Sequence, residues 1–136
     1  MIEHATPGIA LGIALAAAIG APARFVVERW VTDRAVRRAS AGPARWWAMF
    51  PWGLLAVNAV GSAVAGASWA LMAGGAARVV LVGFCGAFTT FSGFGWQVVQ
   101  LWRQDRRACA LAIIAMPTAC IVAFLLAQRI AHLAVG

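Results

Sequence analysis

The sequence predicts an all-α membrane protein with four transmembrane helices, and three observations lead to that prediction. Hydrophobic residues make up 63% of the 136-residue chain and charged residues only 11%, too few to cover the surface of a soluble domain. Four apolar runs are long enough to cross a hydrocarbon core, which takes about 20 residues as a helix. These runs lack the alternation of apolar and polar residues that barrel strands show. We expect a single domain over residues 1–136.

The first two runs predict helices over about residues 8–28 and 52–73. No charged residue occurs between Pro7 and Ala23, and Glu3 and His4 precede this run in place of the basic segment of a signal peptide. The second run follows Pro51. The intervening link is long, and its arginines and tryptophans suit the headgroup level of a bilayer; they are Arg34, Arg37, Arg38, Trp46 and Trp47.

The last two runs predict helices over about residues 77–102 and 108–131. A tight Gly74–Gly75 turn precedes the third helix, and a short charged link at Arg103–Arg107 precedes the fourth. Helices joined by such short links are antiparallel neighbours. In the fourth helix, Pro117 loosens the backbone hydrogen bonding. Together with Thr118 it either continues a polar track or forms a kink whose freed backbone group Thr118 satisfies.

The third helix is expected to be interrupted near its middle. The segment Gly83–Gly95 contains four glycines, three hydroxyl residues and four phenylalanines, and glycine and threonine are weak helix formers. Backbone carbonyls freed at this depth must be buried in protein or must face water or an ion, so a break here can present oxygens to a small cation. The alternative is a continuous helix whose hydroxyls bond back to the preceding turn.

Polar and aromatic residues within the runs are the candidate functional residues. Asn58 either bonds a neighbouring helix, with Gly61 and Gly66 allowing close approach, or donates to a ligand. Phe91 and Phe94 share a helix face. Their positive ring edges can contact an anion, with Ser92 as a further donor; ordinary packing is the alternative.

The remaining charged and thiol residues do not indicate a catalytic or metal site. Arg24 either snorkels to the headgroups or attracts anions into a vestibule. Cys85, Cys109 and Cys120 lack metal-ligand spacing. The sequence has no acid pair, no Ser-His-Asp set and no phosphate-binding glycine loop. We therefore expect that the protein is not an enzyme.

Three segments resemble the motifs of the CrcB/Fluc fluoride channels. Gly20–Phe25, with the sequence GAPARF, is similar to the family's G-A-x-x-R-aromatic stretch. Trp52–Gly61 resembles aromatic-G-T-L-x-x-N-x-x-G. Gly83–Phe94, with the sequence GFCGAFTTFSGF, is similar to the highly specific signature G-F-x-G-G-x-T-T-F-S-T-F. Length and helix number also agree, so the resemblance covers essentially the whole chain.

The resemblance implies a passive, fluoride-selective channel in the cell inner membrane that exports the toxic anion from the cytoplasm. Family members form inverted, antiparallel dimers with two fluoride pores and a central structural sodium ion. By that resemblance, Asn58 is the pore carboxamide, Phe91 and Phe94 are the pore rings, Ser92 belongs to a polar track and Arg24 to the vestibule. The backbone carbonyls of Gly86 and Thr89 are implied as the sodium ligands.

The chain departs from the family pattern at three positions. Gly93 and Leu54 each stand where the family usually has threonine, and Ala87 stands in place of a glycine beside the sodium site. The glycine at position 93 removes one hydroxyl of the polar track. A non-conducting partner subunit of a heterodimeric fluoride channel therefore stays open as an alternative.

A proton-coupled small multidrug exporter is the alternative from another class of transporter. Such antiporters need an ionisable acid in the middle of the first helix. Glu28 lies beyond Arg24, at the end of the predicted helix, and no acid lies deeper in the run.

The arginines are distributed unequally between the two sides of the predicted bundle. One side holds Arg78 and Arg129, whereas the other holds Arg29, Arg34, Arg37, Arg38, Arg45, Arg103, Arg106 and Arg107. Because positive loops stay in the cytoplasm, both termini are expected outside. Copies of one chain insert in both orientations only when the two sides carry nearly equal numbers of arginines, and a homodimer of oppositely inserted copies needs both orientations. The bias therefore leads to the hypothesis that the chain pairs with an oppositely biased paralogue.

Overall fold

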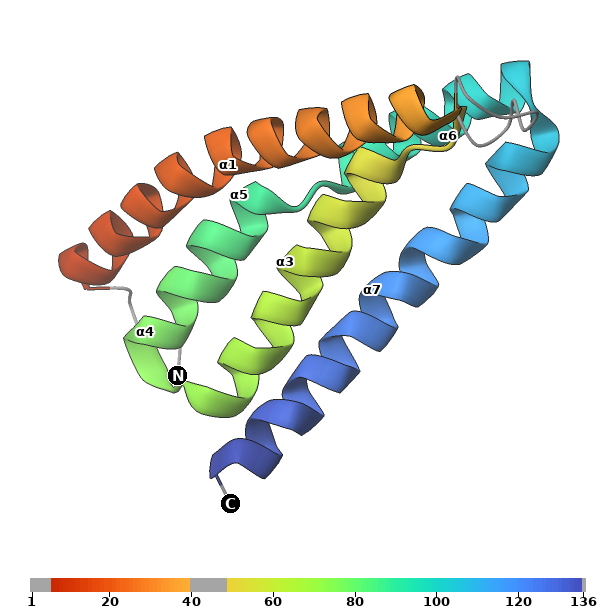
Figure 1. Cartoon of the computed structure of the whole chain (residues 1–136). Helices are drawn as coiled ribbons and strands as arrows, with labels where there is room; N and C mark the ends of the chain where they lie inside the picture. Colours follow the sequence, from red (N-terminus) through yellow and green to blue (C-terminus); the bar gives the residue numbers. More distant parts are fainter. Residues whose placement is uncertain (1–5, 40–48, 136) are drawn as a thin grey trace.

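The computed structural model describes residues 6–39 and 49–135, which form a bundle of helices (Figure 1). Helix α1 spans Pro7–Ala39, α3 spans Trp52–Leu71 and α7 spans Arg106–Val135. The third membrane segment is composite. It consists of α4 (Gly74–Arg78), the π-helix η1 (Val79–Cys85), α5 (Gly86–Phe88) and α6 (Phe91–Gln104). The four segments predicted from the apolar runs are all present, and each is long and apolar enough to cross a membrane.

Helix α1 continues to Ala39, beyond the predicted end at residue 28. At about 1.5 Å per residue, its 33 residues span about 50 Å, whereas a hydrocarbon core is about 30 Å thick. Charged residues end a membrane span without ending a helix, and Arg29 pairs with Asp33 one turn further along at 4.0 Å. The headgroup segment therefore begins as the basic end of α1, while Trp46 and Trp47 lie outside the described residues.

The predicted interruption of the third helix is confirmed. Thr89 and Thr90 have extended backbones, with φ and ψ of −90° and 165° at Thr89 and of −152° and 123° at Thr90. The helix before them and α6 after them are therefore two half-helices that meet at an extended link (Figure 1). The alternative of a continuous helix is wrong.

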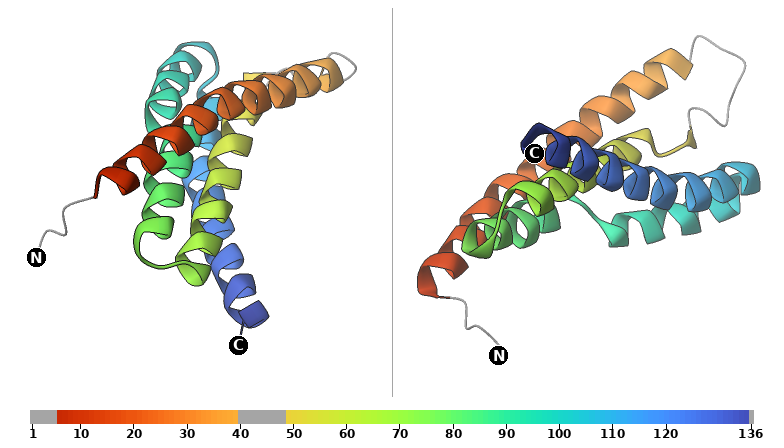
Figure 2. Two further views of the ribbon diagram at one scale, coloured as in Figure 1. Left: turned by 90° about the vertical axis from the view of Figure 1, so that its left-hand side faces the viewer. Right: turned by 90° about the horizontal axis from the view of Figure 1, so that it is seen from below.

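Helix α3 lies centrally, between α1 and α7 (Figure 2). A Cβ atom at Gly66 would overlap the backbone carbonyl of Phe124, so the backbones of α3 and α7 touch at this glycine. Just beyond the C-terminal end of α3, Gly74 takes a φ of +64°, which lets the chain reverse into α4. The buried core consists of Phe50, Leu54, Val57, Phe88, Leu101, Ala108, Cys109, Ala112 and Met116.

Helix α7 runs unbroken through Pro117. The hydroxyl of Thr118 donates to the carbonyl of Ile114 at 2.7 Å, so a side chain adds a hydrogen bond in the turn that the proline loosens. The interruption of the third segment therefore has no counterpart in the fourth.

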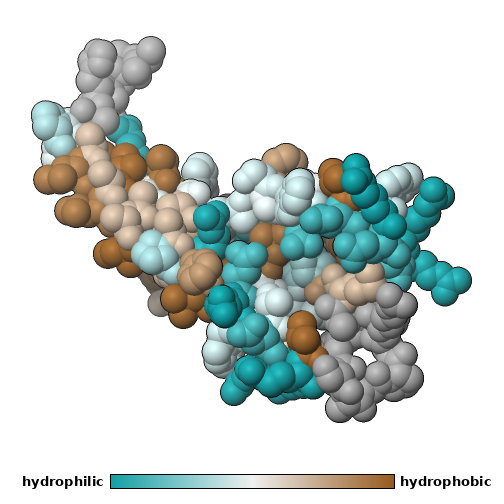
Figure 3. Space-filling view, turned by 90° about the horizontal axis from the view of Figure 1, so that it is seen from above, coloured by the Kyte–Doolittle hydropathy of each residue, from teal (hydrophilic) through white to brown (hydrophobic). Residues whose placement is uncertain are grey.

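The outer surface is that of a multi-pass membrane protein. Large apolar side chains are exposed along all four segments, including Ile19 of α1, Trp69 of α3, Trp96 of α6 and Ile130 of α7. Figure 3 shows hydrophilic residues gathered toward the end of the bundle where α1 and α6 finish, and hydrophobic residues toward the opposite end of α1. Lipid is the solvent for most of this surface.

Candidate functional site

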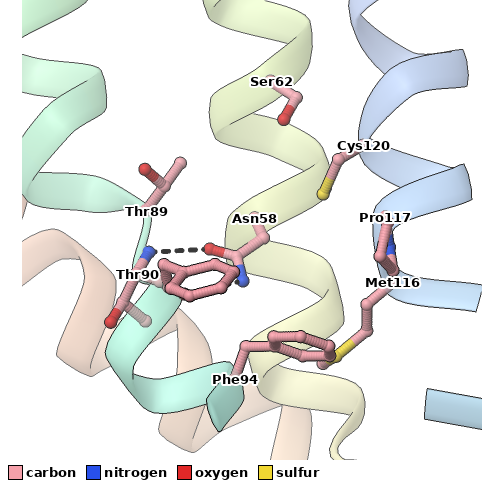
Figure 4. A pocket seen from close by; sticks show the side chains of 9 residues that line it. Asn58, Ser62, Thr89, Thr90, Phe94, Met116, Pro117 and Cys120 are labelled. Atoms are coloured by element: carbon pink, nitrogen blue, oxygen red, sulfur yellow. Dashed lines mark hydrogen bonds between the residues drawn. The ribbon is translucent and has the colours of Figure 1, made fainter. Parts of the chain in front are cut away.

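An open cavity of about 280 Å³ lies beside the extended link of the third segment (Figure 4). Three elements form its walls: the middle of α3, the link with the first turn of α6, and the middle of α7. The lining residues are Asn58, Ser62, Thr89, Thr90, Phe91, Phe94, Met116, Pro117 and Cys120.

Asn58 holds the link through both ends of its carboxamide. The backbone N–H of Thr90 donates to Asn58 Oδ1 at 2.8 Å, and Asn58 Nδ2 donates to the carbonyl of Thr90 at 3.2 Å. The interhelical role predicted for Asn58 is therefore present. The side chain is 9% exposed, and the second proton of its amide nitrogen is left for another acceptor.

Threonine side chains close the two half-helix ends at the link. Thr89 donates both its backbone N–H and its hydroxyl to the carbonyl of Cys85, each at 2.9 Å. The hydroxyl oxygen of Thr90 accepts the backbone N–H of Gly93 at 3.0 Å, which is an N-cap of α6. It also lies 3.1 Å from the hydroxyl oxygen of Ser92. The two threonines thus form a polar base for the cavity between the C-terminal end of one half-helix and the N-terminal end of the next, which carry partial charges of opposite sign.

The two predicted pore rings lie against each other at the start of α6. The ring centroids of Phe91 and Phe94 are 5.8 Å apart, and the ring planes are tilted by 49°. Phe91 is 84% exposed, whereas Phe94 is half-buried and packs on the core. Both rings line the cavity, and Figure 4 shows Phe94 pointing toward Met116 of α7.

The structure places four of the predicted site residues at one cavity, namely Asn58, Thr89, Phe91 and Phe94. Ser92 is exposed and reaches the cavity only through its contact with the Thr90 hydroxyl. Gly86 lies on an exposed face of the third segment, before the link. Arg24 lies within α1, half-buried, and does not line the cavity.

Of the lining residues on α7, the sequence indicated Pro117 but not Met116 or Cys120, and Ser62 of α3 was also missed. Met116 and Cys120 are one turn apart and face the cavity together, as do Asn58 and Ser62 on α3. The four-residue spacing of two polar residues, Asn58 and Ser62, was a usable signal in the sequence. Nothing in the apolar fourth run distinguished Met116 and Cys120 from core residues.

Leu54 and Gly93, two of the three residues that depart from the motif pattern, lie next to each other in the structure. A Cβ atom at Gly93 would lie 3.2 Å from Leu54 Cδ1 and 2.9 Å from Thr90 Cγ2. Leu54 is 2% exposed, so it occupies the volume that a side chain at position 93 would need. The larger residue at position 54 and the smaller one at position 93 therefore compensate each other in volume.

We expect Gly93→Thr alone to destabilise the protein by about 1–3 kcal/mol, because it overpacks the space between Leu54 and Thr90. Leu54→Thr alone should destabilise it through a cavity and a buried hydroxyl. The double variant should recover at least about 1 kcal/mol of the summed loss, measured by denaturant unfolding in detergent. The control pair is Gly93→Thr with Leu125→Thr, at an exposed residue of α7, which should be additive. Additivity of the Leu54–Gly93 pair would refute the compensation.

Comparisons with known proteins agree with the motifs and the fold. The model of the family described as "CrcB-like protein, Camphor Resistance (CrcB)" matches residues 11–128. The chain is 35% identical over 113 residues to "Fluoride-specific ion channel FluC 1" of Geobacillus kaustophilus, covering 81% of this chain and 85% of the relative. It is 34% identical over 130 residues to "Fluoride-specific ion channel FluC" of Methylocella silvestris, covering 90% and 88%.

A shorter match reaches higher identity. The chain is 48% identical over 62 residues to "Fluoride-specific ion channel FluC 2" of Haloarcula marismortui, covering 45% of this chain and 52% of the relative. The family match extends over most of the chain, and these relatives are channels, which are not enzymes. This four-span chain with an interrupted third segment belongs to the CrcB-like family of membrane proteins.

Proposed function

We propose that the chain is a subunit of a fluoride-selective channel, through which fluoride leaves the cytoplasm passively. The observation that carries this proposal is the convergence of Asn58, Phe91 and Phe94 on one cavity at the helix break. The names of the curated relatives, fluoride-specific ion channels, support the choice of ion.

The cavity offers weak anion donors without a full positive charge. The edges of the Phe91 and Phe94 rings carry partial positive charge, the Asn58 amide has a second proton, and α6 begins here with the positive end of its dipole. Among the described residues that line the cavity there is no arginine, histidine or carboxylate. A small hydrated anion would exchange its water for these donors in steps and would not be trapped by an ion pair.

Ser92 and Arg24 would serve the same ion outside the cavity. The Ser92 hydroxyl lies within hydrogen-bond distance of the Thr90 hydroxyl, so it would extend the polar track along the start of α6. Arg24 would raise the local fluoride concentration electrostatically, as part of a vestibule.

An inverted dimer is the assembly that we propose for this subunit. Gly86, Phe91 and Ser92 of the third segment are exposed on the single chain next to the break. Lipid tails cannot satisfy polar groups at this depth, so a second subunit covering this face would complete the site. A two-fold axis in the membrane plane would pair each break with its copy.

The same axis would create the structural sodium site. The N–H of Thr90 would reach the Gly86 carbonyl in a continuous helix, but it donates to Asn58 instead. A Cβ atom at Gly86 would meet nothing closer than the Leu81 carbonyl at 3.8 Å, so this backbone is open to a partner. The carbonyls of Gly86 and Thr89 from two subunits would supply four oxygens, the donor type that sodium takes at broken helices.

The arginine distribution supports a fixed orientation in the cell inner membrane. The basic end of α1 lies at the same end of the bundle as Arg103, Arg106 and Arg107 (Figure 1), while Arg45 lies outside the described residues. This end would face the cytoplasm. An oppositely biased paralogue would then be the partner, and the numbered names FluC 1 and FluC 2 of two relatives suit such pairs.

The two alternatives receive less support. A proton-coupled multidrug exporter requires an acid in the middle of the first helix, and both acids of α1, Glu28 and Asp33, follow Arg24. A non-conducting partner subunit was suggested by Gly93. The packing of Leu54 against this position gives the glycine a steric reason that does not involve the cavity lining.

Fluoride release from liposomes, followed with a fluoride electrode, tests the proposal. Phe94→Ile should slow release at least about tenfold by removing a ring edge from the path, with the protein still folded. Phe25→Ile, at an exposed ring of α1, is the control and should release fluoride at the wild-type rate. Release only after an oppositely biased paralogue is added would support the heterodimer. Absence of release in both cases would contradict the channel assignment.

Epitope tags at the two termini test the orientation. We expect both tags to be labelled only from outside intact cells, because eight of the arginines lie at the opposite ends of the membrane spans. A variant with Arg103, Arg106 and Arg107 changed to glutamine should show labelling from both sides, since it loses much of the bias. Equal labelling from both sides in the wild-type chain would exclude a fixed orientation and favour a homodimer.

A further inference from the structure

A second cavity, which we call the arginine pocket, lies between the basic end of α1 and the start of α3. Its volume is about 260 Å³. Among the described residues, none that lines it also lines the cavity beside the extended link. The pocket is lined by Trp30, Val31, Arg34, Ala35, Arg38 and Trp52.

The charge of this pocket is not neutralised within the described part of the chain. Arg34 and Arg38 are one turn apart and face the same pocket. No carboxylate is within salt-bridge distance of either among residues 6–39 and 49–135, since the ion pair found there joins Arg29 to Asp33. The guanidinium of Arg34 lies 4.3 Å from the centre of the Trp30 ring, which fixes its position by a cation–π contact.

The start of α3 adds further positive potential. This 20-residue helix begins at Trp52 after Pro51, with no side-chain cap and no acidic residue in its first turn. Its positive dipole end adjoins the pocket at Trp52, whose backbone N–H donates to the Phe50 carbonyl at 2.9 Å, so the helix adds its dipole without a counter-charge from its own first turn. Two guanidinium groups and a helix N-terminus together are suited to a phosphate group.

The pocket also lies at the depth of lipid phosphates. Trp52, which lines the pocket, begins the charge-free run of α3, so the pocket lies where this membrane span meets the headgroups. Trp30 and Trp52 border the pocket, and tryptophan favours the membrane–water interface. The same pairing of arginine over tryptophan recurs at this end of the bundle, where the Arg106 guanidinium lies 4.9 Å from the Trp102 ring.

We propose that the arginine pocket binds the phosphate of an acidic phospholipid. Arg34 and Arg38 hold the phosphodiester, and the rings of Trp30 and Trp52 pack against the glycerol and the upper acyl chain. The net negative charge of the lipid distinguishes it from a zwitterionic one, whose ammonium group would face the two arginines. This site is independent of the proposed fluoride path.

Native mass spectrometry of the full chain in detergent tests the site, with three separate ligands: phosphatidylglycerol, phosphatidylcholine and inorganic phosphate. Each arginine near an anionic lipid surface contributes about fivefold in affinity. Arg34→Gln/Arg38→Gln should therefore bind phosphatidylglycerol about thirtyfold more weakly than wild type. The control Arg103→Gln/Arg107→Gln removes the same charge at the same end of the bundle outside the pocket, and should change the affinity less than about threefold.

The other ligands decide between lipid and free phosphate. Phosphatidylcholine should bind more weakly than phosphatidylglycerol and equally to all variants. Equal binding of the two lipids to wild type, or unchanged phosphatidylglycerol binding by the Arg34/Arg38 variant, would overturn the proposal. Inorganic phosphate binding as tightly as the lipid would also overturn it, in favour of a free-phosphate site.

Two further measurements separate this site from folding and from ion conduction. Arg34→Lys/Arg38→Lys keeps the charge but loses the planar two-pronged donor, so its affinity should fall between those of wild type and the glutamine variant. Fluoride release by the glutamine variant in phosphatidylcholine liposomes should match wild type. A loss of lipid binding with normal release would support the lipid site alone.

Discussion

The paired hydrogen bonds between the Asn58 carboxamide and the backbone of Thr90 are the interaction on which the site depends. By accepting the Thr90 N–H, Asn58 takes the donor that would otherwise continue the helix from Gly86. This diversion ends α5, leaves Thr89 and Thr90 extended, and lets α6 start at Phe91. The break, the ring pair and the freed carbonyls thus depend on this buried side chain of α3, together with the threonine hydroxyls that close the two half-helix ends.

The packing of α3 makes this interaction possible. Contact between the backbones of α3 and α7 at Gly66 brings Asn58 and the cavity wall of Met116 and Cys120 together. On the other side, Leu54 fills the space that Gly93 leaves at the first turn of α6. The large side chain of Leu54 and the glycine at position 93 thus let α6 pack against α3, while the cavity beside them stays open.

Much of this architecture could be predicted from the sequence. Charge-free runs indicated the four spans, and the Gly83–Gly95 composition predicted the break because weak helix formers cluster there. The end of α1 was missed because charge marks the membrane boundary and not the helix boundary. The motifs also indicated Asn58, Phe91 and Phe94, but a pattern does not report which backbone atoms an amide binds. On α7 the sequence indicated Pro117 but not Met116 and Cys120, because these two are indistinguishable from core residues in an apolar run.

Amide hydrogen exchange at Thr90, in the protein reconstituted in nanodiscs, tests most directly whether Asn58 holds the break. In wild type the Thr90 amide should be protected by its bond to Asn58 Oδ1, whereas in Asn58→Leu it should exchange much faster. The Thr89 amide, which donates to the Cys85 carbonyl, should stay protected in both. Equal protection of Thr90 in the two proteins would contradict the account, because the break would then be held by some other interaction.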